Sequence, residues 1–212
     1  MIRGVDYWIT NRSPVPRMTQ VTMRYCTALQ LDPGTAGIRA FHKFSAVSIY
    51  DPDVTGTGHQ PHGHDTYQLL YQHYKVIGSK ITATFSPAGA QGGSGTMVCA
   101  VTLDDSVTEP PSDIQNVIEG PDCVYAIASN ADGGPNIVTL TKTFSPMKFL
   151  GVTPDQWRSA ASALFGQNPN EDAYFNVFAA PLNQSVDADP VNVQIEISYI
   201  VQCTEPRNVT PS

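Results

Sequence analysis

Three histidines within six residues, His59, His62 and His64, are the side chains of this sequence best suited to chemistry. Imidazoles at positions i and i+2 of a strand can bind one metal ion when a nearby carboxylate and a distant histidine complete the ligand set. Here Gln68 stands where the carboxylate belongs, four residues after His64, and no histidine follows His73. We therefore expect no metal ion and assign the three histidines to a polar loop or an interface.

Other patterns that carry chemistry are incomplete. Asp51, Asp53 and Thr55 begin like a calcium-binding loop, but its twelfth position is His62 instead of a bidentate glutamate. A calcium ion shared between subunits stays open. The sequence has no Gly-x-Ser-x-Gly elbow, and the glycine-rich run 89–95 lacks the following Lys-Ser/Thr that cradles a phosphate. The prediction is a chain without catalytic residues or cofactors.

The histidines lie in a long connection between two predicted strands. Turn-forming residues fill 51–58, and apolar residues then recur at helical spacing from Tyr67 to Tyr74, with Asp65 where an N-cap belongs. From Lys75 to Phe85 the period becomes two, which predicts a half-buried strand. Loop, short helix and strand therefore form one unit.

Alternating apolar residues predict strands along the rest of the chain. In the first of them the odd positions face a core and Arg24 faces outward. A second helix is predicted by the capping pattern Thr153-Pro154-Asp155-Gln156, with proline at the first helical position. The eight predicted strands are 18–31, 38–49, 75–85, 97–103, 123–128, 136–144, 174–180 and 191–203.

Eight strands, with one helix before the third and one before the seventh, are typical of a jelly roll. Lettered B to I, the strands are joined by connections that alternate between short and long. In such a fold the short connections lie at one end and the long ones at the other, which predicts a wedge-shaped molecule. Identical wedges can pack around a symmetry axis. We therefore expect an all-β chain: a single eight-stranded antiparallel jelly roll with two short helices in the long C–D and G–H connections. The expected domain is 18–205, with a leading segment 1–17 and a tail 206–212.

Composition and cysteine usage agree with this class. The chain has 212 residues, 41% of them hydrophobic, which is enough for one core, and Gly 16 and Pro 17 favour short strands. Neither a run of ~20 apolar residues nor a signal peptide occurs, so we expect a soluble chain that is not secreted and has no membrane partner. Four cysteines without C-x-x-C spacing predict free thiols.

Charge is unevenly distributed along the chain. Residues 1–80 hold eight basic and five acidic side chains, a balance of +3, whereas the remainder has a balance of −10. Phosphate binding needs clustered lysine and arginine, so this distribution excludes a free-standing DNA-binding protein.

The segment 49–85 resembles the corresponding part of the capsid proteins of small circular Rep-encoding single-stranded DNA (CRESS-DNA) viruses. The shared features are Asp-Pro-Asp at 51–53, Gly-His-Gln-Pro at 58–61 and Tyr-x-x-Tyr-x-Val-x-Gly-Ser-Lys-Ile at 71–81, with weaker likeness over 171–205. The resemblance implies a non-enzymatic structural protein of the virion. Its copies would assemble in the host nucleus or cytoplasm into an icosahedral shell around single-stranded DNA, and the expected geometry of the shell is T=1. The resemblance does not identify a host receptor.

The resemblance also implies which face meets the genome. In such capsids the B-I-D-G sheet and the residues before it face inward, so the cations nearest DNA would be Arg3, Arg12, Arg17, Arg24 and Lys80. These capsid proteins usually begin with an arginine-rich arm, which the first residues here lack. We therefore expect weak, strongly salt-dependent DNA affinity.

The loop and helix from Asp51 to Tyr74 are predicted to form a subunit interface. A connection of this length is usually functional, and this one contains tyrosines and histidines but neither lysine nor glutamate, as interfaces favour. Histidines in an interface would make assembly sensitive to pH near ~6.5. Two alternatives stay open: a cupin-like metal-binding jelly-roll enzyme using the histidines, and a carbohydrate-binding jelly-roll module. The predicted interface residues are His59, His62, His64, Tyr67 and Tyr71.

Overall fold

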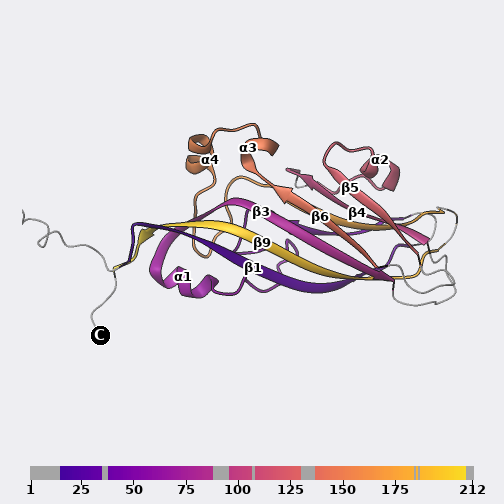
Figure 1. Cartoon of the computed structure of the whole chain (residues 1–212), viewed down its shortest axis with the longest axis horizontal. Coiled ribbons are helices and arrows are strands. Elements are labelled where there is room, and N and C mark those ends of the chain that lie inside the picture. The colour runs from indigo at the N-terminus through magenta and orange to yellow at the C-terminus, as the bar shows by residue number, and fades with distance from the viewer. Residues whose placement is uncertain are drawn as a thin grey trace, which may run out of the picture.

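Strict alternation of buried and exposed residues builds the first of two antiparallel sheets. The computed structural model describes residues 15–34, 38–87, 96–106, 108–129, 137–183, 185 and 187–208. In β9 (Val191–Pro206) the odd residues from Val191 to Val201 are buried and most even ones are not. β1 (Met18–Leu31) pairs with one edge of β9, and β3 (Tyr71–Pro87) pairs with the other. β6 (Val138–Phe144) then pairs with β3, which gives the order β1-β9-β3-β6 (Figure 1).

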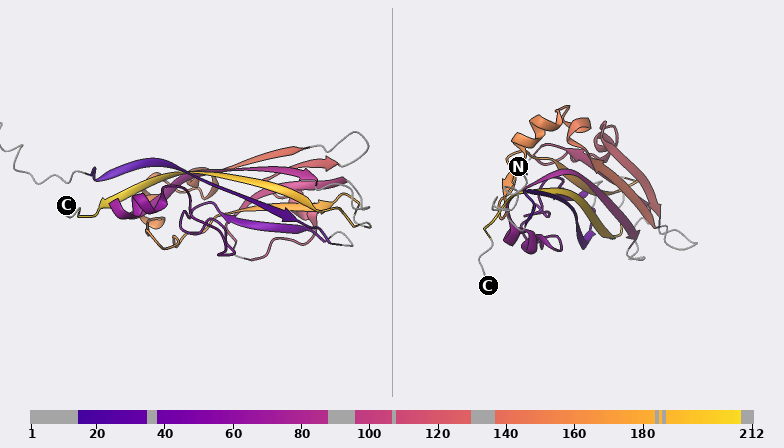
Figure 2. Two further views of the ribbon diagram at one scale, coloured as in Figure 1. Left: turned by 90° about the horizontal axis from the view of Figure 1, so that it is seen from below. Right: turned by 60° about the vertical axis from the view of Figure 1, so that its left-hand side comes forward.

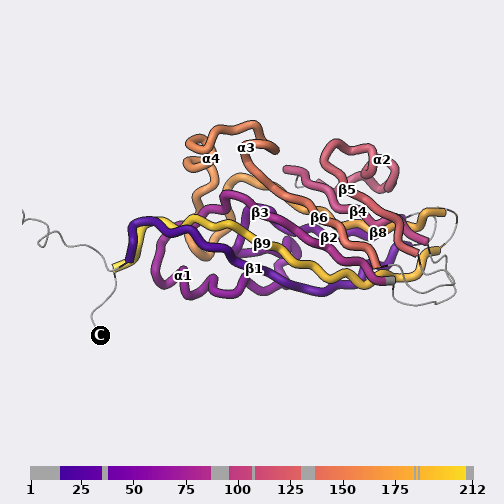
Figure 3. The backbone as a smooth tube through the Cα atoms, viewed as in Figure 1, coloured from indigo at the N-terminus to yellow at the C-terminus, as the bar shows by residue number. Residues whose placement is uncertain are grey.

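The second sheet has the order β2-β8-β4-β5 (Figure 3). It comprises β2 (Ala40–Ser45), β8 (Tyr174–Pro181), β4 (Thr96–Asp104) and β5 (Cys123–Ser129). Every residue of β8 is buried, because the strand is central in its sheet and is covered on both faces. This explains its continuous apolar run, YFNVFAAP.

The two sheets pack face to face, and the chain passes between them repeatedly (Figure 2). In chain order, the strands of the first sheet are β1, β3, β6 and β9, and those of the second are β2, β4, β5 and β8. With letters B to I, these are the B-I-D-G and C-H-E-F sheets of a jelly roll, which confirms the predicted fold class. In the described parts of the chain the structure adds a two-residue strand, β7 (Ala163–Leu164), beside the start of β3.

The helices differ in number and extent from the prediction. α1 (His64–Leu70) and α4 (Pro154–Ala160) lie in the expected connections, but α2 (Ile114–Ile118) and α3 (Pro146–Phe149) bring the described helices to four. The helix expected to reach Tyr74 ends at Leu70, because β3 begins at Tyr71 and takes these residues into the sheet. Gly63, with φ 90°, occupies the N-cap in place of Asp65, which lies in the first turn of the helix.

Two local predictions have clear physical outcomes. The capping box of α4 is confirmed: Thr153 Oγ1 accepts from Gln156 N at 3.3 Å, and Gln156 Oε1 accepts from Thr153 N at 2.8 Å. The second strand, expected over 38–49, is wrong in extent, because the Ser45 hydroxyl accepts from the backbone N–H of Val47 and Ser48 and turns the chain.

Candidate subunit interface

α1 lies at the end of the molecule where β1 begins and β9 ends, and the long connection 46–63 that precedes it passes the middle of β1 at Arg24 and Tyr25 (Figures 1 and 2). Side chains fasten this connection to the barrel. The Ser48 hydroxyl accepts from the N–H groups of Tyr50 and Asp51, and it donates to Asn168 Oδ1 at 2.6 Å. The backbone N–H of Ser45 donates to the Pro52 carbonyl at 2.8 Å. The connection is therefore an ordered part of the fold, held by its own hydrogen bonds.

Asp53 is the buried anchor of this connection. Its Oδ1 accepts from Thr55 N at 3.0 Å and Thr55 Oγ1 at 2.8 Å, and it lies 2.9 Å from His42 Nε2. Burial tends to raise the pKa of Asp53, but the hydrogen bonds from Thr55 and the contact with His42 outweigh it, so the pKa is lowered. Asp53 is therefore an ionised structural acceptor at neutral pH.

Gly58 is required by the close approach of the loop to the barrel. A Cβ at this position would lie 2.8 Å from Asp53 Cβ and 2.9 Å from the Tyr25 hydroxyl oxygen. Only glycine leaves room for the backbone there. The Gly-His-Gln-Pro motif thus begins with a residue that sets the depth of the loop.

The next two histidines are exposed on this loop. The His59 ring meets the Tyr25 ring edge to face, with centroids 4.7 Å apart. His62 is also exposed, and its backbone N–H donates to the Arg24 carbonyl at 3.3 Å. Both imidazoles are thus presented to the surroundings on a loop whose backbone is held against β1.

His64 has a different environment. Its side chain is 1% exposed, lies against Phe165 with ring centroids 5.4 Å apart, and places Nδ1 3.0 Å from Asp65 Oδ1. Its Nε2 is buried, and within the described ranges no hydrogen-bond partner reaches it. The three histidines therefore do not converge on one point, and the described residues contain no group of three or more histidine, cysteine, aspartate or glutamate side chains suited to a metal ion.

The tyrosines divide between core and surface. Tyr71 is 1% exposed and its hydroxyl donates to the Pro16 carbonyl at 3.1 Å, while Tyr74 donates to the Gln167 carbonyl at 2.8 Å. Burial raises the pKa of Tyr74 to about 12. Tyr67 remains half-buried. Of the predicted interface residues, His64 and Tyr71 therefore act within the chain, His59 and His62 face outward, and Tyr67 packs against the core while keeping part of its side chain exposed.

Sequence reasoning missed one surface residue in this region. Leu69 is 77% exposed on α1, which makes it the most exposed large hydrophobic side chain in the described ranges. It falls between the apolar positions that pack α1 onto the barrel. An apolar residue on the otherwise polar side of a short helix is the pattern that could have identified it.

The outer face of the first sheet carries the predicted genome-facing cations. Arg24 and Lys80 flank Ser198 on neighbouring strands, and Arg24 Nε lies 3.4 Å from Glu196 Oε1. Six threonines and several amides make up most of the remaining face: Thr22, Thr82, Thr84, Thr139, Thr141, Thr143, Gln20, Gln30, Asn192 and Gln194. Arg17 precedes β1 and is exposed, and Arg3 and Arg12 lie outside the described residues.

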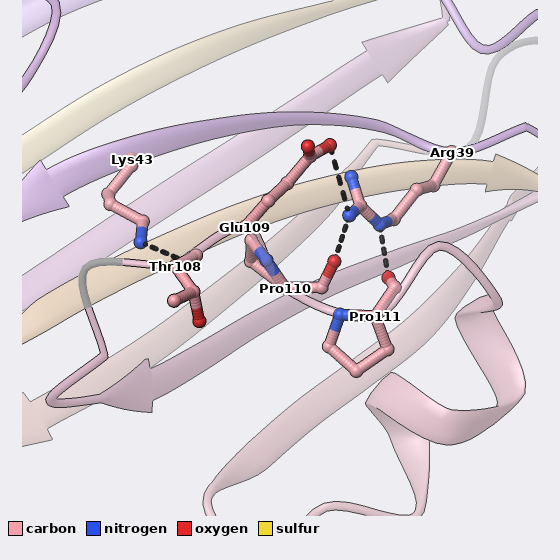
Figure 4. A network of polar contacts seen from close by, with 6 residues as sticks. All are labelled: Arg39, Lys43, Thr108, Glu109, Pro110 and Pro111. Atoms are coloured by element: carbon pink, nitrogen blue, oxygen red, sulfur yellow. Dashed lines mark hydrogen bonds and ion pairs between the residues drawn. The ribbon is translucent and has the colours of Figure 1, made fainter.

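The connection between β4 and β5, described over 105–106 and 108–122 and here called the strap, crosses the outer face of the second sheet to reach β2. Arg39 donates to the carbonyls of Pro110 and Pro111 and to Glu109 Oε1 (Figure 4). Lys43 Nζ donates to the Ser106 and Thr108 carbonyls at 2.9 and 3.0 Å. These contacts hold α2 over an apolar cluster formed by Val98, Ala100, Ile114, Val117, Phe178 and Ala180.

A hollow of about 310 Å³ lies beneath the strap, between α2 and the ends of β4 and β5. Its apolar walls are supplied by Phe149, Phe178, Val117 and the three prolines of the strap, Pro110, Pro111 and Pro121. Asp104 lines it as well; burial raises the pKa of this carboxyl group, and Asn176 Nδ2 donates to it. The hollow is part of the joint between strap and sheet.

Two further properties bear on function. No helix in the described ranges is long and apolar enough to cross a membrane. All four cysteines are free, and the register places Cys99 opposite Ala126 and Cys123 opposite Thr102, so these two thiols are not cross-strand partners.

The chain matches no protein-family model and no curated protein. Among solved structures it is similar to the nodavirus of the giant freshwater prawn Macrobrachium rosenbergii in a semi-empty VLP, with 11% identity, TM-score 0.49, and coverage of 95% of this chain and 100% of that chain. Similarity to Cocksfoot mottle virus has 10% identity and TM-score 0.49, over 93% and 88% of the two chains. The decameric BFDV capsid protein has 12% identity and TM-score 0.45, over 91% and 100%.

Proposed function

We propose that this chain is a non-enzymatic viral capsid protein whose copies assemble into an icosahedral shell, with T=1 geometry, around circular single-stranded DNA. The observation that carries the proposal is the jelly roll with B-I-D-G and C-H-E-F sheets, whose C–D connection bears the motifs at 51–53 and 58–61 and whose strand β3 bears the motif at 71–81. In the described chain these motifs build structure: Asp53 anchors the loop, Gly58 fits against Tyr25 and Tyr71 packs inside. The cupin-like alternative loses its basis, because the histidines diverge.

The test is assembly of the purified chain. Negative-stain electron microscopy and light scattering after size-exclusion chromatography should find closed particles of uniform diameter. A chain that stays monomeric at high concentration, across salt and pH conditions that promote protein association, would refute the proposal. Metal analysis and glycan-array binding on the same sample address the enzyme and carbohydrate alternatives directly.

The subunit interface is proposed at His59, His62 and Tyr67, joined by Leu69. These residues lie on a connection that Asp53, Ser48 and Gly58 hold against the sheets. Because the connection is already ordered in the monomer, formation of the subunit contact costs little further conformational entropy. Replacing His59 and His62 with glutamine should lower particle yield and reduce its dependence on pH near ~6.5, with unchanged stability of the monomer. His64→Gln is the matched control, since its buried ring should affect folding more than assembly. Unchanged yield and pH dependence in the double variant would exclude this interface.

The interior surface is proposed to be the outer face of the β1-β9-β3-β6 sheet, with Arg17, Arg24 and Lys80 nearest the genome. Glu196 offsets the charge of Arg24, so this face neutralises few phosphates. Phosphate-directed affinity should therefore be weak and should fall steeply with salt.

A further inference from the structure

At one end of the outer face of the first sheet is a hollow of about 440 Å³, here called the amide cup. The side chains that line the cup on this face come from β1, β3, β9 and the residue before β6. They are Ala28, Gln30, Thr84, Ser86, Asn192, Gln194 and Ile137. Two cross-strand rows form it. One joins Ala28, Gln194 and Thr84, and the next joins Gln30, Asn192 and Ser86. The hollow exists because Ala28 has only a methyl group, whereas Gln30 in the next row has a long side chain at the equivalent position of β1.

The described residues that line the cup are uncharged. Amides and hydroxyls form most of its wall, and Ile137 and Ala28 supply apolar contact. Glu196 lies on the same face two residues beyond Gln194, ion-paired with Arg24 at 3.4 Å. A phosphate in the cup would gain no cation and would lie near a carboxylate. The cup is therefore unsuited to the backbone of a nucleic acid.

The amides are held in defined orientations. Gln194 Nε2 donates to the Thr27 and Ile195 carbonyls at 3.1 and 3.3 Å, so its Oε1 is the end left to accept. Asn192 Oδ1 accepts from Gln30 Nε2 at 3.3 Å, so its Nδ2 is the end left to donate. Gln194 and Asn192 lie two residues apart on one face of β9, so the strand presents an acceptor and a donor, the two kinds of group that pair with the donor and the acceptor on the edge of a nucleobase.

We propose that the amide cup binds bases of single-stranded nucleic acid through their hydrogen-bonding edges. The proposal rests on the proposed function, in which this sheet faces the genome, and adds base contacts to a face poor in phosphate contacts. A sugar hydroxyl could pair with the same amides, so free hexose is the competing ligand in the test below.

The test is fluorescence anisotropy of the whole chain, as dissociated subunits, with a labelled adenine octanucleotide and a matched abasic octamer. The abasic strand should bind at least about tenfold more weakly, since one good amide–base pair discriminates by about 1–3 kcal/mol. Raising salt from about 50 to 200 mM should weaken that base-dependent part by no more than about threefold, the effect of a single phosphate contact; five contacts would give about a hundredfold.

Gln194→Met removes the acceptor while keeping the length of the side chain, and it should reduce binding of the adenine strand to the level of the abasic strand. Gln20→Met is the control, because Gln20 is exposed on β1 outside the cup. Thermal melting of both variants verifies folding. Equal binding of the two strands by the parent chain, or displacement of the strand by free hexose, would overturn the proposal. Particle formation is scored separately, so failure of the cup and failure of the shell are distinguishable.

Discussion

Arg39 is the residue whose replacement should most clearly separate strap from barrel. Its side chain is 5% exposed and donates to two backbone carbonyls of the strap (Figure 4). The guanidinium carbon also lies 4.4 Å from the ring centroid of Phe41. Each hydrogen bond from a charged donor contributes about 1.5–3 kcal/mol, and the cation–π contact adds about 1 kcal/mol. The ion pair with Glu109 adds little, because Glu109 is 72% exposed.

Arg39→Met should therefore lower the free energy of unfolding by about 3 kcal/mol, once the apolar burial regained by methionine is allowed for. Urea denaturation of dissociated subunits measures this change. Amide hydrogen exchange should rise in 108–122 and stay unchanged in β1 and β9, because the strap contacts the second sheet.

Glu109→Gln is the matched control and should change stability by less than about 1 kcal/mol, as expected for an exposed ion pair. Arg39→Lys keeps the charge but loses the two-pronged geometry, so it should fall between the parent and Arg39→Met. A loss below about 1 kcal/mol for Arg39→Met, or faster exchange spread over both sheets, would refute the idea that this guanidinium holds the strap.

Three further predictions concern the loop and the thiols. Gly58→Ala should destabilise the chain by about 1–3 kcal/mol in urea melts, because the added methyl group would overlap Asp53. Asp53 has a lowered pKa, so its ionised form adds stability that is complete above the ordinary value of 3.8 and is lost as pH falls below it; the stability difference from Asp53→Asn should shrink over that range in pH-dependent melts. Alkylation of the native chain should modify exposed Cys26 first and spare Cys99, whose pKa burial raises to about 12.

Each has a control or a contrary outcome. Gly34→Ala should be nearly neutral, since its added Cβ would come no closer than 3.6 Å to Ile38. A stability difference between Asp53→Asn and the parent that stays constant well below pH 3.8 would show that the carboxylate charge is not what holds the loop. Mass analysis after unfolding without reductant should find four modified thiols, and fewer would indicate a disulfide.

In the loop region the sequence predicts which residues are apolar and buried, but not where the helix ends or which histidines are buried. The stripe from Tyr67 to Tyr74 identified residues that pack inward, but it could not place the boundary between helix and strand. Leu70 and Tyr71 satisfy both periods, and pairing of Tyr71 with Pro206 on β9 decided in favour of the strand. Likewise, three nearby histidines could have converged on a metal ion. Only the path of the loop separated buried His64 from exposed His59 and His62.

The sequence by itself determined the all-β class, the eight main strands, the capping box of α4 and the alternation of short and long connections, because these depend on local periodicity and turn chemistry. The tertiary structure decided which groups meet across the barrel. Arg39 and the strap prolines are about seventy residues apart, and Gln30 and Asn192 are farther apart still. Their contacts follow from strand order and register, which bring distant segments side by side; no local pattern in the chain encodes those pairings.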